Sequence, residues 1–285
     1  MNRLSQTLRT AVKSRLPFLV SPLRRARSVA QALWLTASRG ALRTPLLRRL
    51  PIAAWVRRVL RPPDLERLPL VRRLRSLTWD RGQRRLVFEA ILRDNTWGDA
   101  ESRSGMGSNL LYTETLRAEL PPLIEEFGFR SMLDIPCGDF FWMRLLTLDL
   151  TYVGGDIVPR LVERNQSLFG GERRRFAQLD IVCDRLPKVD LVFCRDCLVH
   201  LSYEDAFRAL SNIKRSGSTY LLTTTYVDRQ SNRDIRTGDW RTLNLRLPPF
   251  GLATPLRLID ERAPQEGFRD KSLGLWMIAD LPVRR

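Results

Sequence analysis

The sequence has few of the features that mark a secreted or membrane-spanning protein. Its 285 residues include only four cysteines and one histidine. Four cysteines in a chain of this length do not make a disulfide framework, so we expect a reducing, cytoplasmic compartment. No apolar run reaches the roughly 18 residues of a membrane-spanning helix, so no helix is expected to cross a bilayer. Internal repeats and low-complexity segments are also missing.

Acidic residues are nearly missing from the first 75 residues. The chain has 48 basic and 31 acidic residues. The first 75 residues contain 18 of the basic and 2 of the acidic ones, so the remaining 210 contain 30 basic and 29 acidic residues. The excess positive charge therefore lies in this N-terminal arm. Within it, 51–61 and 70–77 place apolar residues on one helical face and arginines on the other. Such helices suit an anionic membrane surface, which the arm would bind peripherally. The alternatives are that the segments pack on the main domain or stay largely unfolded, or that the arm is an organellar transit peptide or a twin-arginine export signal.

After the arm, residues 76–130 are expected to form a helical cap. The pattern predicts a helix at 84–95 and then a loop rich in glycine and serine at 96–108. Ser108 is placed to cap a second helix, which should end before Pro121 because proline lacks the N–H that a helix needs.

Residues 131–285 show the alternation of an α/β domain. Seven short apolar runs predict strands at 131–135, 151–156, 175–181, 189–194, 219–226, 255–260 and 273–281. Helices are expected at 139–148, 158–169 and 203–214, and none between the last two strands. This order predicts a Rossmann-like, mostly parallel seven-stranded sheet with an antiparallel C-terminal strand and helices on both faces.

Glycines are scarce in the turn after the first strand, LDIPCGDFFW at 133–142. A dinucleotide dehydrogenase would need three glycines there to bring a pyrophosphate onto a helix N-terminus, and Asp139 would repel phosphate. The single Gly138 still permits a close backbone approach. Asp156 ends the second strand 18 residues later, near the spacing of an acid that accepts both ribose hydroxyls. A ligand with a ribose and no phosphate fits this pattern.

The strand ends continue this pattern. Asp180 ends the third strand and is expected to accept a hydrogen bond from an adenine amino group, with Ile181 packed on the ring. The ordered acids and the turn resemble those of the class I S-adenosylmethionine-dependent methyltransferases, over residues 131–281. A bacterial subgroup with LDxPCGDFxWM is similar and keeps Pro136 where most members have glycine. The resemblance implies S-adenosyl-L-methionine as cofactor, bound by Asp134, Cys137, Gly138, Asp156, Ile157, Asp180, Ile181 and Cys194.

Methyl transfer is an in-line displacement, and a general base is needed only if the acceptor holds its proton. Asp196 and His200 follow the fourth strand, where the resemblance implies acceptor-side residues, and they are the candidate catalytic residues. The unperturbed pKa of histidine suits a base near neutrality, although a lone histidine at a helix start is often structural. Trp142 is either a partner of the sulfonium or a core residue.

Other polar clusters are less specific. Cys194 and Cys197 form a CxxC, but the other two cysteines fit no zinc template, so no metal is expected. The stretch 232–250 is too long for a plain connection and predicts an acceptor pocket or lid, with an ordered surface loop as the alternative. Arg103 is a candidate for the carboxylate of the cofactor.

The leading hypothesis is methyl transfer to an unidentified small-molecule, glycan or lipid-linked acceptor, with the arm at the cytoplasmic membrane face. An RNA methyltransferase whose arm contacts phosphates is one alternative, although the remainder of the chain is nearly neutral. A non-catalytic binding or scaffold protein that retains the fold is the other.

Overall fold

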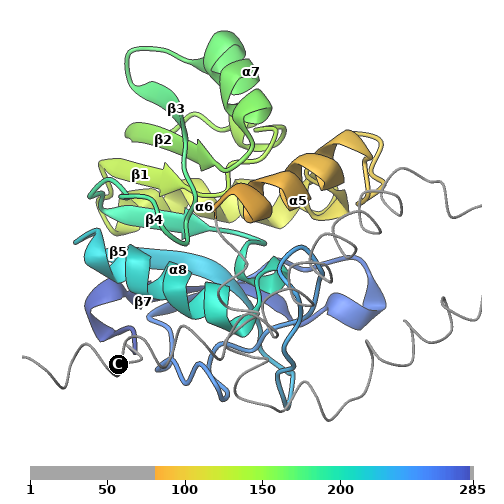
Figure 1. The fold of residues 1–285 in the computed structure, drawn as a ribbon. Helices are drawn as coiled ribbons and strands as arrows, with labels where there is room; N and C mark the ends of the chain where they lie inside the picture. The colour runs from red at the N-terminus through yellow and green to blue at the C-terminus, as the bar shows by residue number, and fades with distance from the viewer. Residues whose placement is uncertain (1–80, 283–285) are drawn as a thin grey trace, which may run out of the picture. The chain divides into compact units, whose positions relative to one another are not determined.

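The computed structural model describes residues 81–282. The basic arm and both of its amphipathic segments lie outside the described residues. The centre of the fold is a seven-stranded sheet in the order β3-β2-β1-β4-β5-β7-β6 (Figure 1). Its strands are β1 (Ser131–Asp134), β2 (Thr151–Asp156), β3 (Arg174–Gln178), β4 (Leu191–Cys194), β5 (Tyr220–Tyr226), β6 (Arg257–Asp260) and β7 (Lys271–Met277).

The helices are α5 (Arg81–Arg93), α6 (Glu114–Glu126), α7 (Pro159–Phe169) and α8 (Tyr203–Arg215). The first five strands pair in parallel, and β7 is antiparallel to both β5 and β6. The predicted Rossmann-like sheet is therefore confirmed. The final strand enters the sheet between β5 and β6, so β6 forms the edge. None of the described helices has the length and hydropathy of a membrane span.

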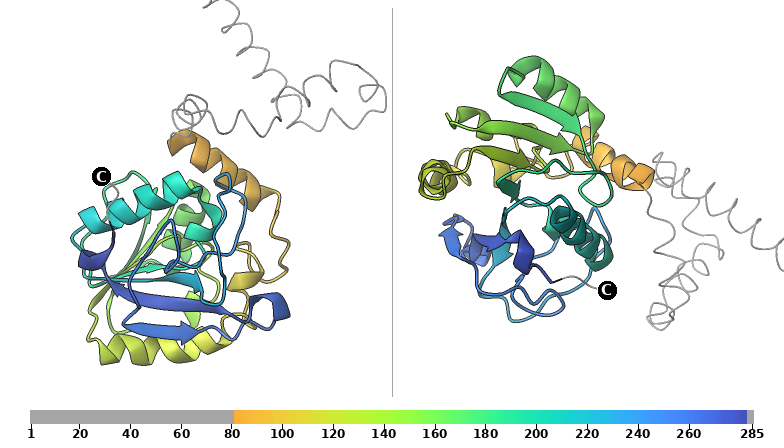
Figure 2. Two further views of the ribbon diagram at one scale, coloured as in Figure 1. Left: turned by 90° about the horizontal axis from the view of Figure 1, so that it is seen from below. Right: turned by 90° about the vertical axis from the view of Figure 1, so that its left-hand side faces the viewer.

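Alternate residues of the strands divide the core between two faces. Leu133 of β1 and Val192 of β4 lie in one buried cluster together with the apolar face of α8. Their neighbours Met132 and Leu191 lie in a second cluster with the apolar face of α6. Figure 2 shows α6 and α8 on opposite sides of the sheet. Because both faces are covered, functional side chains are left to the strand ends.

The second helix of the cap differs from its prediction at both ends. α6 begins at Glu114, later than expected, because the preceding turn is held by a hydrogen bond from the Asn109 amide to Asp99 at 3.0 Å. At its other end α6 runs through Pro121 and Pro122. The helix buries an apolar face against the sheet, and this burial outweighs the hydrogen bonds that the two prolines cannot make.

The helix predicted at 139–148 is wrong. Only Met143–Leu145 form a single 3₁₀ turn in this stretch. Phe140 has a φ of 58°, a left-handed conformation that an α-helix does not contain. Asp139, expected to cap the helix, instead binds a loop that precedes it by about 35 residues in the chain. A local sequence pattern carries no sign of such a distant contact.

Candidate functional site

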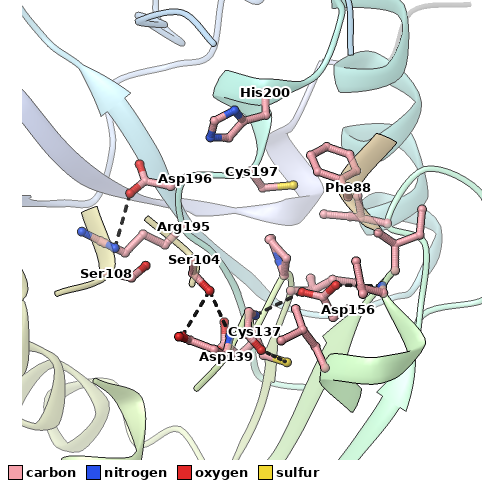
Figure 3. Close-up of a pocket in the computed structure, with 18 of the residues that line it drawn as sticks. Phe88, Ser104, Ser108, Cys137, Asp139, Asp156, Arg195, Asp196, Cys197 and His200 are labelled. Carbon is pink, nitrogen blue, oxygen red and sulfur yellow. Dashed lines mark hydrogen bonds and ion pairs between the residues drawn. The ribbon is translucent and has the colours of Figure 1, made fainter. Parts of the chain in front are cut away.

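A cavity lies beyond the carboxyl ends of β1, β2 and β4, where ligands bind in open α/β sheets. Figure 3 shows Asp156 beside the turn that holds Cys137, with Asp196 and His200 on another wall. The cavity brings together nine of the ten predicted site residues, namely Asp134, Cys137, Gly138, Asp156, Ile157, Asp180, Ile181, Asp196 and His200.

Cys194 is the exception among the predicted cofactor contacts. Its side chain is fully buried in the apolar cluster under α8 and does not line the cavity. It is the last residue of β4, and the alternation of the strand turns it away from the ligand side. Cys197, three residues further along, lines the cavity instead.

Gly138 is needed at its position for two separate reasons. Its φ of 53° is in the left-handed region that favours glycine. A Cβ atom built there would also meet Ser104 Oγ at 2.2 Å. The sequence predicted that a ligand would approach the Gly138 backbone closely. In the structure, the Ser104 side chain makes this close approach. The turn is further fixed by Asn165, whose amide donates to the Gly138 carbonyl at 2.8 Å.

The loop at 99–108 is docked onto this turn through Asp139. The Asp139 carboxylate accepts hydrogen bonds from Ser102 Oγ, at 3.0 Å, and from the Arg103 backbone N–H, at 2.8 Å. Ser104 Oγ accepts from the Asp139 N–H at 2.9 Å. Arg103, Ser104 and Ser108 line the cavity. The glycine- and serine-rich loop thus closes one side of the site, and Ser108, expected to cap a helix, faces the cavity.

Asp156 is buried at the end of β2 with acceptor capacity left over. Its two oxygens accept from the backbone N–H groups of Val158, at 2.9 Å, and Gly138, at 3.1 Å. The Ile157 N–H also acts on this carboxylate, and because a carboxylate offers about four acceptor positions, capacity is left for a ligand. Burial raises the pKa of Asp156 to about 6, against the opposing effect of these backbone donors. The group can therefore accept a hydroxyl donor of a ligand.

Asp134 is buried at the end of β1 and paired with a tyrosine. Tyr152 Oη donates to its carboxylate at 2.5 Å. Burial raises the pKa of Asp134 to about 7, and the charge of Asp156 adds to this effect. Near neutral pH the carboxyl is therefore divided between its charged and neutral forms, and a cation in the cavity would favour the charged one.

Helix α5 forms the wall next to Asp180. Phe88 and Leu92 line the cavity and pack with the apolar residues at the start of α7, which are Ile157, Val158 and Leu161. Arg84, one turn earlier, is buried and donates to Asp180 Oδ2 from Nε at 2.9 Å and from Nη2 at 2.8 Å. Asp180 therefore lines the cavity, as expected, but its carboxylate is already paired with Arg84.

Asp196 is held as an anion at the cavity wall. Its φ is 51°, and its N–H donates to Thr224 Oγ1 at 2.8 Å. Lys271 Nζ lies 2.6 Å from its carboxylate and Arg195 Nη1 lies 3.3 Å away. Burial raises the pKa of Asp196, but Lys271 and Arg195 outweigh burial and lower the pKa to about 2. Such a group is a weak proton acceptor near neutrality.

His200 is placed differently from Asp196. It ends the 3₁₀ turn Leu198–His200, and its ring lies 4.8 Å from that of Trp97. Nδ1 lies 3.0 Å from the carbonyl oxygen of Asp239. A carbonyl only accepts, so Nδ1 carries the proton and Nε2 keeps a lone pair. Burial lowers the pKa of His200, which favours this neutral form.

The stretch 232–250 lines none of this cavity, so the prediction that it forms the pocket wall is wrong for the described site. It packs behind His200 instead. Arg241 is fully buried and donates from Nη1 to the carbonyls of Leu198 and Val199, both at 3.2 Å. Gly238 donates its N–H to the His200 carbonyl at 2.8 Å. Leu243 and Leu245 of this segment are fully buried, so the segment packs against the core and supports the His200 turn from behind.

The sequence left two alternatives for Trp142. Trp142 is buried in the cluster under α6 and also lines the cavity, with the Arg195 guanidinium 5.7 Å from its ring. Both interpretations of Trp142 thus fit its position. Among residues 81–282, no group of three or more His, Cys, Asp or Glu side chains is placed to hold a metal ion.

Several lining residues escaped the sequence interpretation. Arg84 and Phe88 are four positions apart, which predicts a shared helix face but not what that face contacts. Trp97 lies in a loop whose contact with the cavity the sequence did not predict. Lys271, which does not line the cavity but pairs with Asp196, begins β7 without any motif around it, and only the antiparallel insertion of that strand brings it to Asp196.

No protein-family model matches the chain, and no curated protein matches it. Solved structures similar to it include the N-methyltransferase NodS of Bradyrhizobium japonicum bound to S-adenosyl-L-homocysteine, at 15% identity over 49% of this chain and 73% of that one, with a TM-score of 0.41. The magnesium protoporphyrin IX methyltransferase of Synechocystis matches at 16% identity over 55% and 83% of the two chains, TM-score 0.41. Human N-acetylserotonin methyltransferase matches at 15% identity over 69% and 56%, TM-score 0.41. Because these identities and TM-scores are low, the function has to be argued from the residues that line the cavity.

Proposed function

We propose that the protein transfers a methyl group from S-adenosyl-L-methionine to a small acceptor molecule. The observation that carries the proposal is Asp156. It is buried at the end of β2, where its carboxylate accepts from backbone N–H groups and keeps acceptor capacity for ribose hydroxyls. The apolar side chains of Ile157 and Ile181 line the cavity beside it, where a base would pack.

The turn at Gly138 supports a nucleoside over a dinucleotide. No helix starts there to direct N–H groups at a diphosphate, because only a 3₁₀ turn follows. Ser104 occupies the space over Gly138, and the Asp139 carboxylate stands beside it. A diphosphate would bring its negative charges next to the Asp139 carboxylate, whereas the methionine part of the proposed cofactor carries an ammonium group beside its carboxylate and has no net charge.

The acceptor side supports a role for His200 as the base and a different one for Asp196. In the proposed step an acceptor lone pair attacks the methyl carbon, the sulfur–carbon bond breaks, and neutral S-adenosylhomocysteine leaves. The acceptor proton passes to Nε2 of His200, which holds a free lone pair. Asp196, kept charged by Lys271, orients the acceptor by accepting a hydrogen bond.

The test is ligand-dependent stabilisation. S-adenosylhomocysteine should raise the melting temperature of the full chain, and Asp156→Ala should remove the shift. Asp149→Ala is the matched control, because Asp149 precedes β2 at the other end of the sheet and pairs only with exposed arginines. No shift in the unaltered protein would reject the cofactor, and a full shift in Asp156→Ala would reject the ribose assignment alone.

The acceptor is best sought without assuming its identity. Protein incubated with methyl-labelled cofactor and fractionated cell extract should label one fraction, and His200→Gln should not. Labelling of RNA in that experiment would replace the small-molecule acceptor by the nucleic-acid alternative. Failure to label any fraction, with cofactor binding intact, would favour a binding protein that retains the fold.

A further inference from the structure

Arg241 is a charged side chain that the fold buries without a countercharge. It is 1% exposed, and its Nη1 atom donates to the carbonyls of Leu198 and Val199. Within residues 81–282, no carboxylate lies within ion-pair distance of its guanidinium, and neither Nε nor Nη2 has a hydrogen-bond partner. The guanidinium carbon lies 5.3 Å from the centre of the Tyr203 ring. A buried charge that is left unpaired is costly, so stability alone does not explain this arginine.

The guanidinium stays protonated near neutral pH in spite of its burial. Burial lowers the pKa of Arg241 to about 10, and the charge of Asp234 opposes this effect. The Asp234 carboxylate is engaged elsewhere, since Oδ1 accepts from the backbone N–H groups of Tyr203, at 2.7 Å, and Ile235, at 2.9 Å. The protein therefore keeps an unpaired positive charge in contact with the turn Leu198–His200.

This turn carries the ring of His200, and the segment around Arg241 fixes the ring relative to the charge. The Gly238 N–H donates to the His200 carbonyl at 2.8 Å, and the Asp239 carbonyl lies 3.0 Å from Nδ1. The N–H of Arg241 itself donates to the Val199 carbonyl at 3.1 Å. A cation held near an imidazole disfavours protonation of the ring.

Charges on other elements also act on His200, but they occur as opposed pairs. Asp196, on the turn after β4, favours the protonated ring, and Lys271, at the start of β7, disfavours it. Their charged groups lie 2.6 Å apart, so their effects on His200 oppose each other. Arg195, the other cation beside Asp196, is itself paired with Glu261. Each of these cations thus has a carboxylate beside it.

Arg241 has no such carboxylate. Burial is the largest cause of the lowered pKa of His200, the hydrogen bond to Asp239 opposes burial, and the charge of Arg241 adds to it. Trp97, whose ring lies 4.8 Å from the imidazole, carries no charge. The charge of Arg241 is therefore the one that acts on His200 without a paired opposite.

We propose that Arg241 is a positioning residue that keeps His200 neutral through its unpaired charge, so that the Nε2 lone pair is available for the proton of the acceptor. The inference rests on the proposed function, in which His200 is the base. Its consequence for the reaction is that the base stays available at lower pH, at some loss of base strength.

The test uses the fact that His200 is the only histidine of the chain. In the untagged full chain labelled with ¹⁵N, the imidazole signals in NMR spectra report the protonation and tautomer of His200 without cofactor or acceptor. We expect a proton on Nδ1 and a pKa below 6.5 in the unaltered protein. Arg241→Gln removes the charge and keeps an amide donor, so the pKa of His200 should rise by about 0.5 or more. An unchanged pKa in the folded variant overturns the inference.

Arg241→Lys separates the charge from the structural contacts, because it keeps the charge and loses the planar set of donors. Since burial lowers the pKa of Arg241 only to about 10, a lysine there should stay protonated below pH 6.5, where His200 titrates. The pKa of His200 should then stay within about 0.2 of its value in the unaltered protein. An equal rise in both variants would show a purely structural role and overturn the inference.

Arg236→Gln is the matched control, because Arg236 is an exposed arginine of the same segment, and its loss should leave the pKa of His200 unchanged. If neither Arg241 variant folds, the unaltered protein decides, since a pKa of 6.5 or above overturns the inference.

Rates measured with methyl-labelled cofactor distinguish this inference from the proposed function. If His200 is the base, the acidic limb of the Arg241→Gln rate profile should move to higher pH by as much as the pKa measured by NMR. A limb that stays in place while the NMR pKa rises would support the effect of Arg241 on His200 and reject the role of His200 as the base.

Discussion

At the scale of single residues, Asp134 gives the protein a pH-dependent stability. Its pKa is about 7 in the folded chain and 3.8 in its ordinary state, chiefly because burial disfavours the charge. A carboxyl whose pKa is raised on folding contributes stability at low pH, and loses it as the pH rises through the folded value. Asp134→Asn removes this titration and keeps an acceptor for Tyr152.

We therefore expect Asp134→Asn to melt a few degrees above the unaltered protein at pH 8, and at the same temperature near pH 4. Asp156 shifts in the same direction, to about 6, and is present in both proteins, so the difference between them reports the titration of Asp134 together with its coupling to Asp156. Calorimetric melting curves from pH 4 to pH 8 measure the effect. A variant less stable at pH 8 would contradict the assignment of a raised pKa.

His200 and Asp196 should differ in how their variants respond to pH. The pKa of His200 lies below 6.5, so activity should fall as the pH drops through that lowered value. His200→Gln should lose about 10²- to 10⁴-fold in kcat and this acidic limb together, with cofactor affinity unchanged. Asp196→Asn should lose about tenfold and keep the limb, because Asp196 stays charged down to about pH 2. Rates measured against pH with labelled cofactor distinguish the two variants. Loss of the acidic limb in Asp196→Asn would assign the role of base to Asp196 and the orienting role to His200.

At the scale of elements, the contact of the turn with the preceding loop can be broken and partly restored. Gly138→Ala places a Cβ 2.2 Å from Ser104 Oγ on a backbone with a φ of 53°. We expect affinity for S-adenosylhomocysteine to fall more than about tenfold, since the loop must move and the left-handed backbone costs roughly 1 to 2 kcal/mol. The same change in a Ser104→Gly protein should lose less, because only the backbone strain remains. Equal losses in both backgrounds would show that Ser104 is not the obstacle.

The strands and their terminal acids were predictable because both depend on local order. Alternating or continuous apolar runs mark β1, β2 and β5, and parallel strands bring Asp134 and Asp156 to one edge whatever the loops do. The failures share a different cause. Asp139 binds residues about 35 positions earlier, and Asp180 binds Arg84, 96 positions earlier. A local pattern identifies a carboxylate at a strand end but not the partner that reaches it.

At the scale of the whole molecule, the boundary expected at residue 131 separates parts that share one cavity. Arg84 and Phe88 of α5 and Ser104 of the loop line it together with the sheet. A chain shortened to 131–285 would leave Asp180 without Arg84, and Asp139 without its serine donors. We expect that chain to lose the melting shift with S-adenosylhomocysteine. Retention of the shift would place the whole cofactor site within 131–285.

The charge of the arm makes a separate prediction for the full chain. Liposomes that contain anionic lipid should retain it, and should release a chain that starts near Ser76, because each basic residue adds about 1 kcal/mol at such a surface. Neutral liposomes serve as the control. Equal retention on neutral and anionic liposomes would end the membrane hypothesis, and salt-sensitive binding to RNA that survives loss of Trp55 would favour the nucleic-acid one.

The insertion of β7 between β5 and β6 sets an order of assembly. Lys271, the countercharge of Asp196, reaches that carboxylate only when this late strand has entered the sheet. While the ribosome is still making the chain, Asp156 and Asp180 emerge well before Lys271 does. Under the proposed function, the nascent protein would hold the acids of the cofactor site before Asp196 has its countercharge, so cofactor binding during synthesis should precede any capacity for methyl transfer.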